Sequence, residues 1–404
     1  MNLIIERLQQ DVLSSIDLNT EITDEELLST IDKILIEKGR ENYISMQKKR
    51  KLRRDIFNSI RKLDVLQDMI EDPLITEIMV NGMQDIFVEK NGVISRSEKQ
   101  FKSEEKLEDV VQQIVSQSNR IVNASSPIVD SRLPDGSRVN IVLPPIALDG
   151  PVITIRRFPQ NPITIEQLID YKSITSEAAE FLEKLVIAKY NIFISGGTGS
   201  GKTTFLNVLS NYIPSNERII TIEDSAELQL RGVSNLVRME VRNENTEGNN
   251  QVSIRDLIKT SLRMRPDRII VGEVRDEAAI DMLQALNTGH DGSLSTGHAN
   301  SPADMLNRLE ALVLLGANIP LMAVRRQIAS AIDIIVHLGR LRDKSRRVLE
   351  ITEVLDLKND EIVLSPLFRF IERGEKHDKI IGKLEKLNNL SYTEKLSRAG
   401  LSTN

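Results

Sequence analysis

The feature that most constrains the fold is a short apolar run followed by a glycine-rich loop and a helix-like segment. Residues 191–195 (NIFIS) are typical of a buried strand, and residues 203–213 (TTFLNVLSNYI) carry apolar side chains at helical spacing. Between them lies the sequence Gly196-Gly197-Thr198-Gly199-Ser200-Gly201-Lys202-Thr203, which Thr204 follows. It matches the P-loop pattern G-x-x-x-x-G-K-[ST], and both flanks agree with that interpretation.

A loop of this kind is suited to phosphate binding. Its glycines let successive backbone N–H groups point at phosphate oxygens, and the following helix adds its positive N-terminal end. Residues 196–204 are therefore predicted to bind a nucleotide, with ATP and Mg²⁺ as the cofactors. We expect Lys202 to reach the β- and γ-phosphates and the Thr203 hydroxyl to coordinate Mg²⁺.

Acidic residues close two further predicted strands. Glu223 and Asp224 lie at the end of the predicted strand RIITIE (218–223), and Glu273 closes the next predicted strand, RIIVGEV (268–274). Ligands of open parallel sheets lie at the carboxyl ends of the strands, where carboxylates can coordinate a metal ion or activate water. The alternative is that these acids only mark solvent-exposed loops. Beside a P-loop, the catalytic interpretation is favoured.

Two of the four histidines occur in similar settings, TGHDG at His290 and TGHAN at His298. A single histidine is more often structural. The repeated Thr-Gly-His setting after the Glu273 strand nevertheless predicts that both are linked to the nucleotide. His337, in DIIVHLG, is expected to be an ordinary strand residue.

Arginines suited to phosphate recognition lie in the preceding region. Arg132 and Arg138 bracket the turn LPDG, and Arg157 follows the strand VITI. Planar guanidinium groups bind phosphate and carboxylate well, so these residues could complete a nucleotide site, or they could form surface ion pairs. A further cluster surrounds the Glu273 strand: Arg263, Arg265, Arg268 and Arg275.

The pattern of predicted helices and strands along the chain indicates several domains. Residues 1–63 read as helices, 64–158 as a smaller α+β domain of short strands and turns, and 159–163 as a linker. From 164 to 404, strands alternate with helices, which predicts an α/β domain with a mostly parallel sheet covered on both faces. The end of this domain, after about residue 370, reads only as a charged tail.

Composition excludes several classes of protein. The chain has no cysteine, which rules out disulfides, a thiolate nucleophile and cysteine-ligated metal sites. The longest apolar stretch, 311–324, is interrupted by Asn318 and Pro320 and is shorter than the ~18–20 residues of a spanning helix. The chain is therefore expected to be cytosolic.

The basic segment 48–54 (KKRKLRR) is either a solvated helix face or a contact for an anionic surface.

Taken together, these motifs resemble the ATPases of the type II/type IV secretion superfamily. DPLITEIMVNG, RLPDGSRVN, GGTGSGKTTFLN, RIITIEDSAEL, LRMRPDRIIVGEVRDEAA and TGHDGSLSTGHANSP occur in one order across residues 60–370. The segment RMRPDRIIVGEVRDEAAIDMLQALNTGHDGS is most similar to the tight-adherence (Flp, type IVc) pilus ATPases, the CpaF-like group. A chain without cysteine cannot form the tetracysteine zinc module of other branches.

The resemblance implies a homohexamer of two-domain subunits in which ATP binds between the N-terminal domain and a RecA-like P-loop domain. It further implies that ATP hydrolysis drives pilus assembly or secretion through polytopic inner-membrane platform proteins. The protein would then be peripheral at the inner face of the cell membrane.

The resemblance also implies roles for individual residues. Glu223 or Glu227 would activate water, Glu273 would be the Walker-B acid near Mg²⁺, His290 and His298 would fall in the His box, and Arg132, Arg138 and Arg157 would sense the γ-phosphate.

Three other functions remain open at this point. A conjugation-type traffic ATPase of a type IV secretion system differs little in sequence from the pilus motor. A RecA-like nucleic-acid translocase is disfavoured by the net charge of −6 and the aromatic content of 3%, so no nucleic-acid partner is expected. A nucleotide-dependent switch without turnover should lack the strand-end glutamates, which are present.

Overall fold

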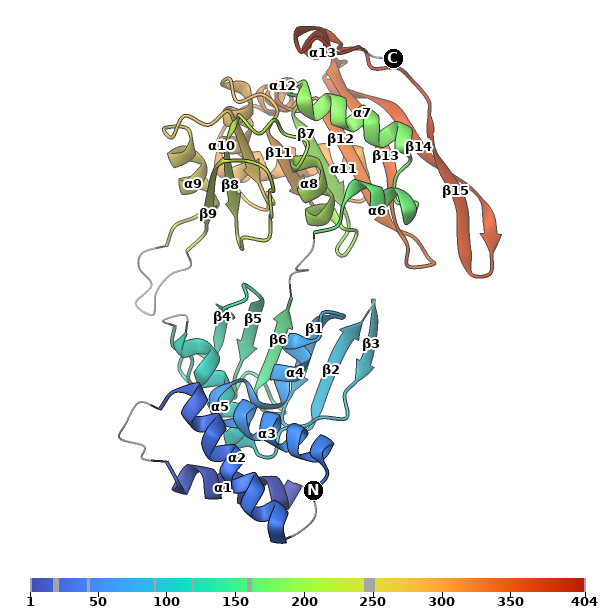
Figure 1. Ribbon diagram of the computed structural model, residues 1–404. Coiled ribbons are helices and arrows are strands. Elements are labelled where there is room, and N and C mark those ends of the chain that lie inside the picture. The colour runs from blue at the N-terminus through green and yellow to red at the C-terminus, as the bar shows by residue number, and fades with distance from the viewer. Residues whose placement is uncertain are drawn as a thin grey trace. The chain divides into compact units, whose positions relative to one another are not determined.

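The computed structural model describes residues 2–16, 22–41, 44–90, 92–117, 120–157, 162–242 and 251–402. The chain divides into two compact units, Met1–Gln160 and Asn161–Asn404 (Figure 1). Residues 159–161 of the predicted linker lie outside the described part of the chain. Among the described residues, no helix has the length and apolar character needed to cross a bilayer.

The first unit combines a helical bundle with an antiparallel sheet. Its helices are α1 (Asn2–Ser14), α2 (Asp24–Glu41), α3 (Met46–Arg61), the 3₁₀ turn η1 (Asp64–Leu66), α4 (Gln67–Glu71) and α5 (Glu104–Ser116). Its strands are β1 (Ile75–Asn81), β2 (Asp85–Lys90), β3 (Val93–Arg96), β4 (Ile128–Arg132), β5 (Arg138–Val142) and β6 (Val152–Arg156). The described strands pair in the order β3-β2-β1-β6-β5-β4, each antiparallel to its neighbour.

The helices α1, α2 and α3 share a core of their own, separate from the core under the sheet. The basic segment 48–54 lies on α3, where Leu52 is buried in that core. Arg53 pairs with Asp32 at 2.7 Å, and Arg54 pairs with Asp68 at 3.2 Å. These pairs favour the interpretation of this segment as a solvated helix face.

The second unit is an α/β domain, which confirms the predicted mixed α/β architecture. Its helices are α6 (Ile165–Asp170), α7 (Ser176–Ile187), α8 (Lys202–Ser210), α9 (Ile254–Ser261), α10 (Ala278–Asn287), α11 (Pro302–Gly316), α12 (Leu321–Ala331) and α13 (Glu394–Arg398). Its strands are β7 (Ile192–Gly196), β8 (Arg218–Glu223), β9 (Asn235–Glu240), β10 (Arg268–Val271), β11 (Leu294–Gly297), β12 (Ile334–Arg340), β13 (Arg346–Lys358), β14 (Glu361–Lys376) and β15 (Lys379–Lys386).

These strands form one sheet in the order β15-β14-β13-β12-β7-β11-β10-β8-β9. The strands from β12 to β9 are parallel, whereas β13, β14 and β15 extend the sheet beyond β12, each antiparallel to the strand before it. Ile192 and Ile194 of β7 face the core that α6, α7 and α8 cover, while Phe193 faces the core under α9 to α12. A strand buried on both faces reads as a continuous apolar run, as β7 does.

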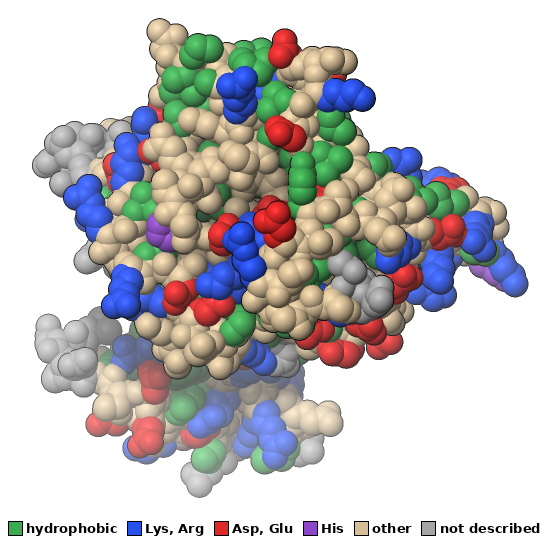
Figure 2. All heavy atoms as spheres, turned by 90° about the horizontal axis from the view of Figure 1, so that it is seen from above, with side chains coloured by type: hydrophobic (Ala, Val, Ile, Leu, Met, Phe, Trp, Pro, Cys, Tyr) green, Lys and Arg blue, Asp and Glu red, His purple; other side chains and the backbone are tan. Residues whose placement is uncertain are grey.

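Residues after 370, predicted to be a tail, form structure instead. The antiparallel strands β14 and β15 make a long hairpin that projects from the unit (Figure 1). Basic and acidic side chains are interspersed on this hairpin (Figure 2), which hides the alternation typical of a strand. Beyond the hairpin, Leu390 and Leu396 are buried in the core of the α/β domain.

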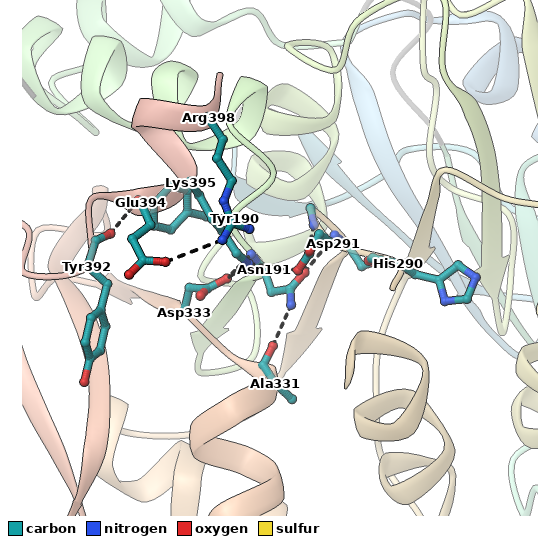
Figure 3. Close-up of polar contacts among 12 residues, drawn as sticks. Tyr190, Asn191, His290, Asp291, Ala331, Asp333, Tyr392, Glu394, Lys395 and Arg398 are labelled. Atoms are coloured by element: carbon teal, nitrogen blue, oxygen red, sulfur yellow. Dashed lines mark hydrogen bonds and ion pairs between the residues drawn. The ribbon is translucent and has the colours of Figure 1, made fainter. Parts of the chain in front are cut away.

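The last helix, α13, is held by a polar network at the amino ends of the parallel strands (Figure 3). Lys395 donates to Asp333 at 2.7 Å and to Asp291 at 2.9 Å, and it lies over the ring of Tyr190. The Tyr190 hydroxyl donates to the carbonyl oxygen of Tyr392 at 2.6 Å. The C-terminal segment is therefore anchored to the segments that precede β7, β11 and β12.

We predict that Lys395→Ala lowers the free energy of unfolding by about 1–3 kcal/mol, because it leaves the largely buried Asp333 without its counter-ion. Arg398→Ala is the matched control on the same helix. The Arg398 side chain is 78% exposed, and its ion-pair partner among the described residues is Glu394, four residues earlier, so its loss should cost about 0.5 kcal/mol or less. Urea denaturation of both variants measures the difference, and equal losses would contradict the anchoring role.

Candidate active site

The parallel strands bring most of the predicted catalytic residues to one edge of the sheet. The glycine-rich loop follows β7, Glu223 ends β8, Glu273 comes two residues after β10, and His298 directly follows β11. Because β7, β11, β10 and β8 are neighbours and parallel, their carboxyl ends lie side by side. This edge is where open α/β sheets bind ligands.

The loop turns sharply as β7 ends. A Cβ atom on Gly196 would overlap the carbonyl oxygen of Leu338 on β12, so only glycine fits there. Gly199 and Gly201 have positive φ values of 71° and 96°, a region that other residues avoid. Gly201 is the N-cap of α8, which begins at Lys202. The N–H groups of this first turn have no partner within the helix and are available to an anion.

Lys202 is a buried cation without an acidic partner among the described residues. Its side chain is 7% exposed, and Nζ donates to the carbonyl oxygen of Gly197 at 3.1 Å. Burial lowers the pKa of Lys202, and the charge of Glu273 partly opposes this. The nearby Ser200 hydroxyl is buried and has no hydrogen-bond partner in the described part of the chain. These unsatisfied donors fit the phosphate chain of a nucleotide.

Glu273 is held ionised by two basic groups. Arg275 donates from Nη2 to Glu273 Oε2 at 2.6 Å, and His298 Nδ1 contacts the other carboxylate oxygen. Arg275 also pairs with Asp224 at 3.3 Å and so joins the ends of β10 and β8. Burial alone would raise the pKa of Glu273, but the hydrogen bonds and charges of Arg275 and His298 lower it below its usual value. An ionised carboxylate is what a Mg²⁺ site requires.

Glu223 has the opposite electrostatic character. It is 2% exposed, and burial raises its pKa to about 7. Its Oε2 accepts hydrogen bonds from the backbone N–H groups of Glu227 at 2.7 Å and Leu228 at 3.0 Å, while Oε1 has no partner among the described residues. One oxygen of Glu223 therefore shapes the loop that carries Glu227. Glu227 itself is partly exposed. The hydrogen bond and charge of Glu273 are the main causes of the raised pKa of Arg275, and the charges of Asp224 and Glu227 add to them.

Comparison with known proteins shows which family the chain belongs to. The family model "Type II/IV secretion system protein" matches residues 60–374. The chain belongs to this family. The conjugal transfer protein TrbB of Rhizobium radiobacter is 34% identical over 312 residues, which covers 74% of this chain and 92% of TrbB. The type IV secretion system protein VirB11 of Bartonella quintana is 30% identical over 332 residues, with coverage of 73% and 92%.

Among solved structures, the Legionella pneumophila ATPase DotB aligns with a TM-score of 0.51 and 22% identity, over 70% of this chain and 78% of DotB. This likeness supports the fold alone. Family membership, together with the loop geometry and the adjoining acids, identifies the chain as an ATP hydrolase, as the sequence predicts.

Of the two histidines predicted to be linked to the nucleotide, His290 does not lie at this edge. His290 precedes β11, whereas His298 follows it, so the two lie at opposite ends of the strand. The His290 ring contacts the carbonyl oxygen of Ala285 at 3.1 Å. His337 lies nearer the loop than its interpretation as an ordinary strand residue implies, because its Nδ1 is 2.9 Å from the hydroxyl of Ser195.

The three arginines predicted to sense the γ-phosphate gather within the first unit. Arg132 and Arg138 are opposite each other across the β4–β5 pair. Arg157 follows β6 and donates to the carbonyl oxygens of Asp72 and, at 2.9 Å, Ile75. Their role toward a nucleotide stays a prediction.

Two further arginines, Arg268 and Arg346, make contacts that the sequence does not predict. Arg268, in the cluster around Glu273, is fully buried and forms an ion pair with Glu217 at 2.5 Å. Arg346, on β13, donates from Nε to the carbonyl oxygen of Gly199 at 2.9 Å. It belongs to no nucleotide-binding motif, and nothing in the surrounding sequence KSRRVLE distinguishes it from a surface arginine.

The raised pKa of Glu223 predicts a pH-dependent stability. The folded state retains the proton up to about pH 7, whereas the unfolded chain releases it near pH 4.5, so stability falls as pH rises between these values. The free energy of unfolding of the wild-type chain, relative to Glu223→Gln, should fall by about 2–3 kcal/mol between pH 5 and pH 8. Denaturation of both proteins at the two pH values measures this, and a constant difference would contradict the buried assignment.

Proposed function

We propose that the chain is a RecA-like motor that couples ATP hydrolysis to pilus assembly or to transport through a type IV secretion system. The observation that carries the proposal is the burial of Lys202 at the glycine-rich loop, where it has no ion-pair partner among the described residues but feels the charge of the ionised Glu273. A loop with these properties needs a phosphate chain to satisfy its donors, and a carboxylate beside it can serve a metal ion.

Different residues of the chain would bind the phosphates and the metal ion at such a site. Lys202 and the N–H groups of the loop would hold the β- and γ-phosphates. Thr203 and Glu273, the latter partly through water, would hold Mg²⁺, which when bound neutralises charge on the transferred phosphoryl group. Arg275 and His298 keep Glu273 ionised and oriented.

We further propose that Glu227, and not Glu223, orients the attacking water. Glu223 is almost fully buried, has a pKa of about 7, and uses one carboxylate oxygen to fix the loop at residues 227 and 228. Glu227 is more exposed and lies in the electrostatic field of Arg275. Glu223 then positions the loop, and Glu227 acts on water.

The transported cargo has two candidates. The similarity of residues 263–293 to tight-adherence pilus ATPases favours a CpaF-like pilus motor. The relatives TrbB and VirB11 favour a conjugation-type traffic ATPase. In either case we propose a homohexamer, peripheral at the inner face of the cell membrane, that acts on polytopic platform proteins. Arg132, Arg138, Arg157, His290 and His298 remain proposed participants in the ATP cycle of this assembly.

The proposed division between the two glutamates can be measured. Glu227→Gln should bind ATP normally but hydrolyse it roughly a hundredfold more slowly, because the group that orients water is lost. Glu223→Gln should keep more of the activity, since an amide oxygen can still accept the two backbone hydrogen bonds. Lys202→Ala is the control that should lose hydrolysis while retaining its circular dichroism spectrum. A larger loss for Glu223→Gln than for Glu227→Gln would exchange the two roles.

The cargo can be identified in the source organism. Replacing the chain by its Lys202→Ala variant should abolish surface filaments if it is a pilus motor, with plasmid transfer unchanged. The opposite pattern is expected for a conjugation-type ATPase. Filaments are scored by electron microscopy and transfer by mating frequency, with the wild-type chain supplied in trans as the control. Normal filaments together with normal transfer would refute both forms of the proposal.

A further inference from the structure

Arg346 differs from three neighbouring arginines of the C-terminal part of the chain, which form ion pairs. Arg342 binds Glu372 and Glu375, Arg369 binds Glu350, and Arg373 binds Glu385, which are ion pairs within the extended sheet. Arg346 instead turns toward the glycine-rich loop, and its Nε donates to Gly199 O at 2.9 Å. Among the described residues, its two Nη groups have no hydrogen-bond or ion-pair partner.

The position of Arg346 is fixed by its backbone. The Ser173 hydroxyl donates to the Arg346 carbonyl oxygen at 2.8 Å, and the next residue, Arg347, donates from Nη1 to Lys172 O at 2.6 Å. On the other side, the turn before β13 is held by Asp343, whose carboxylate accepts from the N–H of Ile380 at 3.0 Å. Arg346 is thus presented to the loop from a rigid support.

The location is electrostatically unfavourable for a cation. The stem of Arg346 lies over Gly201, since a Cβ on that glycine would be 3.6 Å from Arg346 Cδ. Gly201 is the N-cap of α8, and a helix N-terminus carries partial positive charge that repels cations. Lys202 adds a further charge at the same point. Arg346 is exposed and lies beside this helix N-terminus and Lys202, so the local field favours an anion there.

We propose that Arg346 is a nucleotide-binding residue whose free Nη groups contact the phosphates common to ADP and ATP. The proposal rests on the proposed function, because it names a further ligand contact of the same site. It differs from the predicted role of Arg132, Arg138 and Arg157, which is tied to the γ-phosphate. The contact comes from β13, in the same unit as the loop, so it is made with either nucleotide.

The test uses the fact that glutamine and arginine place a nitrogen at the same point of the side chain. Arg346→Gln keeps a donor for Gly199 O but removes the charge and both Nη groups. Loss of one charge-assisted contact to phosphate corresponds to roughly a ten- to hundredfold weaker affinity. We expect Arg346→Gln to raise the Kd for ADP and for a non-hydrolysable ATP analogue by the same factor in this range. KM should rise for ATP while kcat stays within a few fold, and Arg346→Lys should recover part of the affinity.

Titration calorimetry of the full chain measures both affinities, with Arg373→Gln as the matched control on β14. Unchanged ADP affinity in Arg346→Gln would overturn the proposal, even if Arg346→Ala binds weakly, since the residue would then only shape the loop. A loss confined to the ATP analogue would also overturn it. A wild-type chain that binds neither nucleotide would refute the proposed function itself, and this inference with it.

Discussion

The active site depends on the close approach of two backbones at the end of the central strand. Gly196 lies so near the carbonyl oxygen of Leu338 that a side chain at residue 196 would overlap it. This contact lets β12 run beside β7 to the last residue of β7, with His337 opposite Ser195. The glycine-rich loop can then turn away from the sheet while the chain that leaves β12 passes next to it. Glycine at this position serves strand packing as well as phosphate access.

Two glutamates at the ends of neighbouring strands on this edge have different surroundings, and their pKa values therefore shift in opposite directions. Arg275 and His298 contact Glu273 and lower its pKa, whereas burial raises the pKa of Glu223 to about 7. Opposite shifts in neighbouring acids assign them different tasks. An ionised Glu273 can serve a metal ion at neutral pH. A buried and partly protonated Glu223 suits the support of a loop better than the attraction of a cation.

The parts of this arrangement that the sequence predicts are local ones. Residues 191–204 contain strand, loop and helix in one contiguous segment, so the pattern alone indicates the phosphate site. The acids at 223 and 273 are predictable because parallel strands gather their carboxyl ends. His290 shows the limit of local reasoning: its Thr-Gly-His setting matches that of His298, but the four-residue strand β11 separates them. The burial of Glu223 and the approach of Arg346 arise only from tertiary packing, which no local pattern reveals.

The segment that reads as a charged tail supports the site from two directions. In its hairpin, the N–H of Ile380 donates to the carboxylate of Asp343 and so holds the turn before β13. That turn precedes Arg346, which contacts the glycine-rich loop. Its last helix places Lys395 between Asp333 and Asp291, at the other ends of the strands whose carboxyl ends form the site. Hydrogen bonds and ion pairs make both contacts, and Leu390 and Leu396 add apolar packing to the anchor of the last helix. A segment can therefore lack the hydrophobic pattern of a strand and still determine the geometry of a catalytic loop remote from it in sequence.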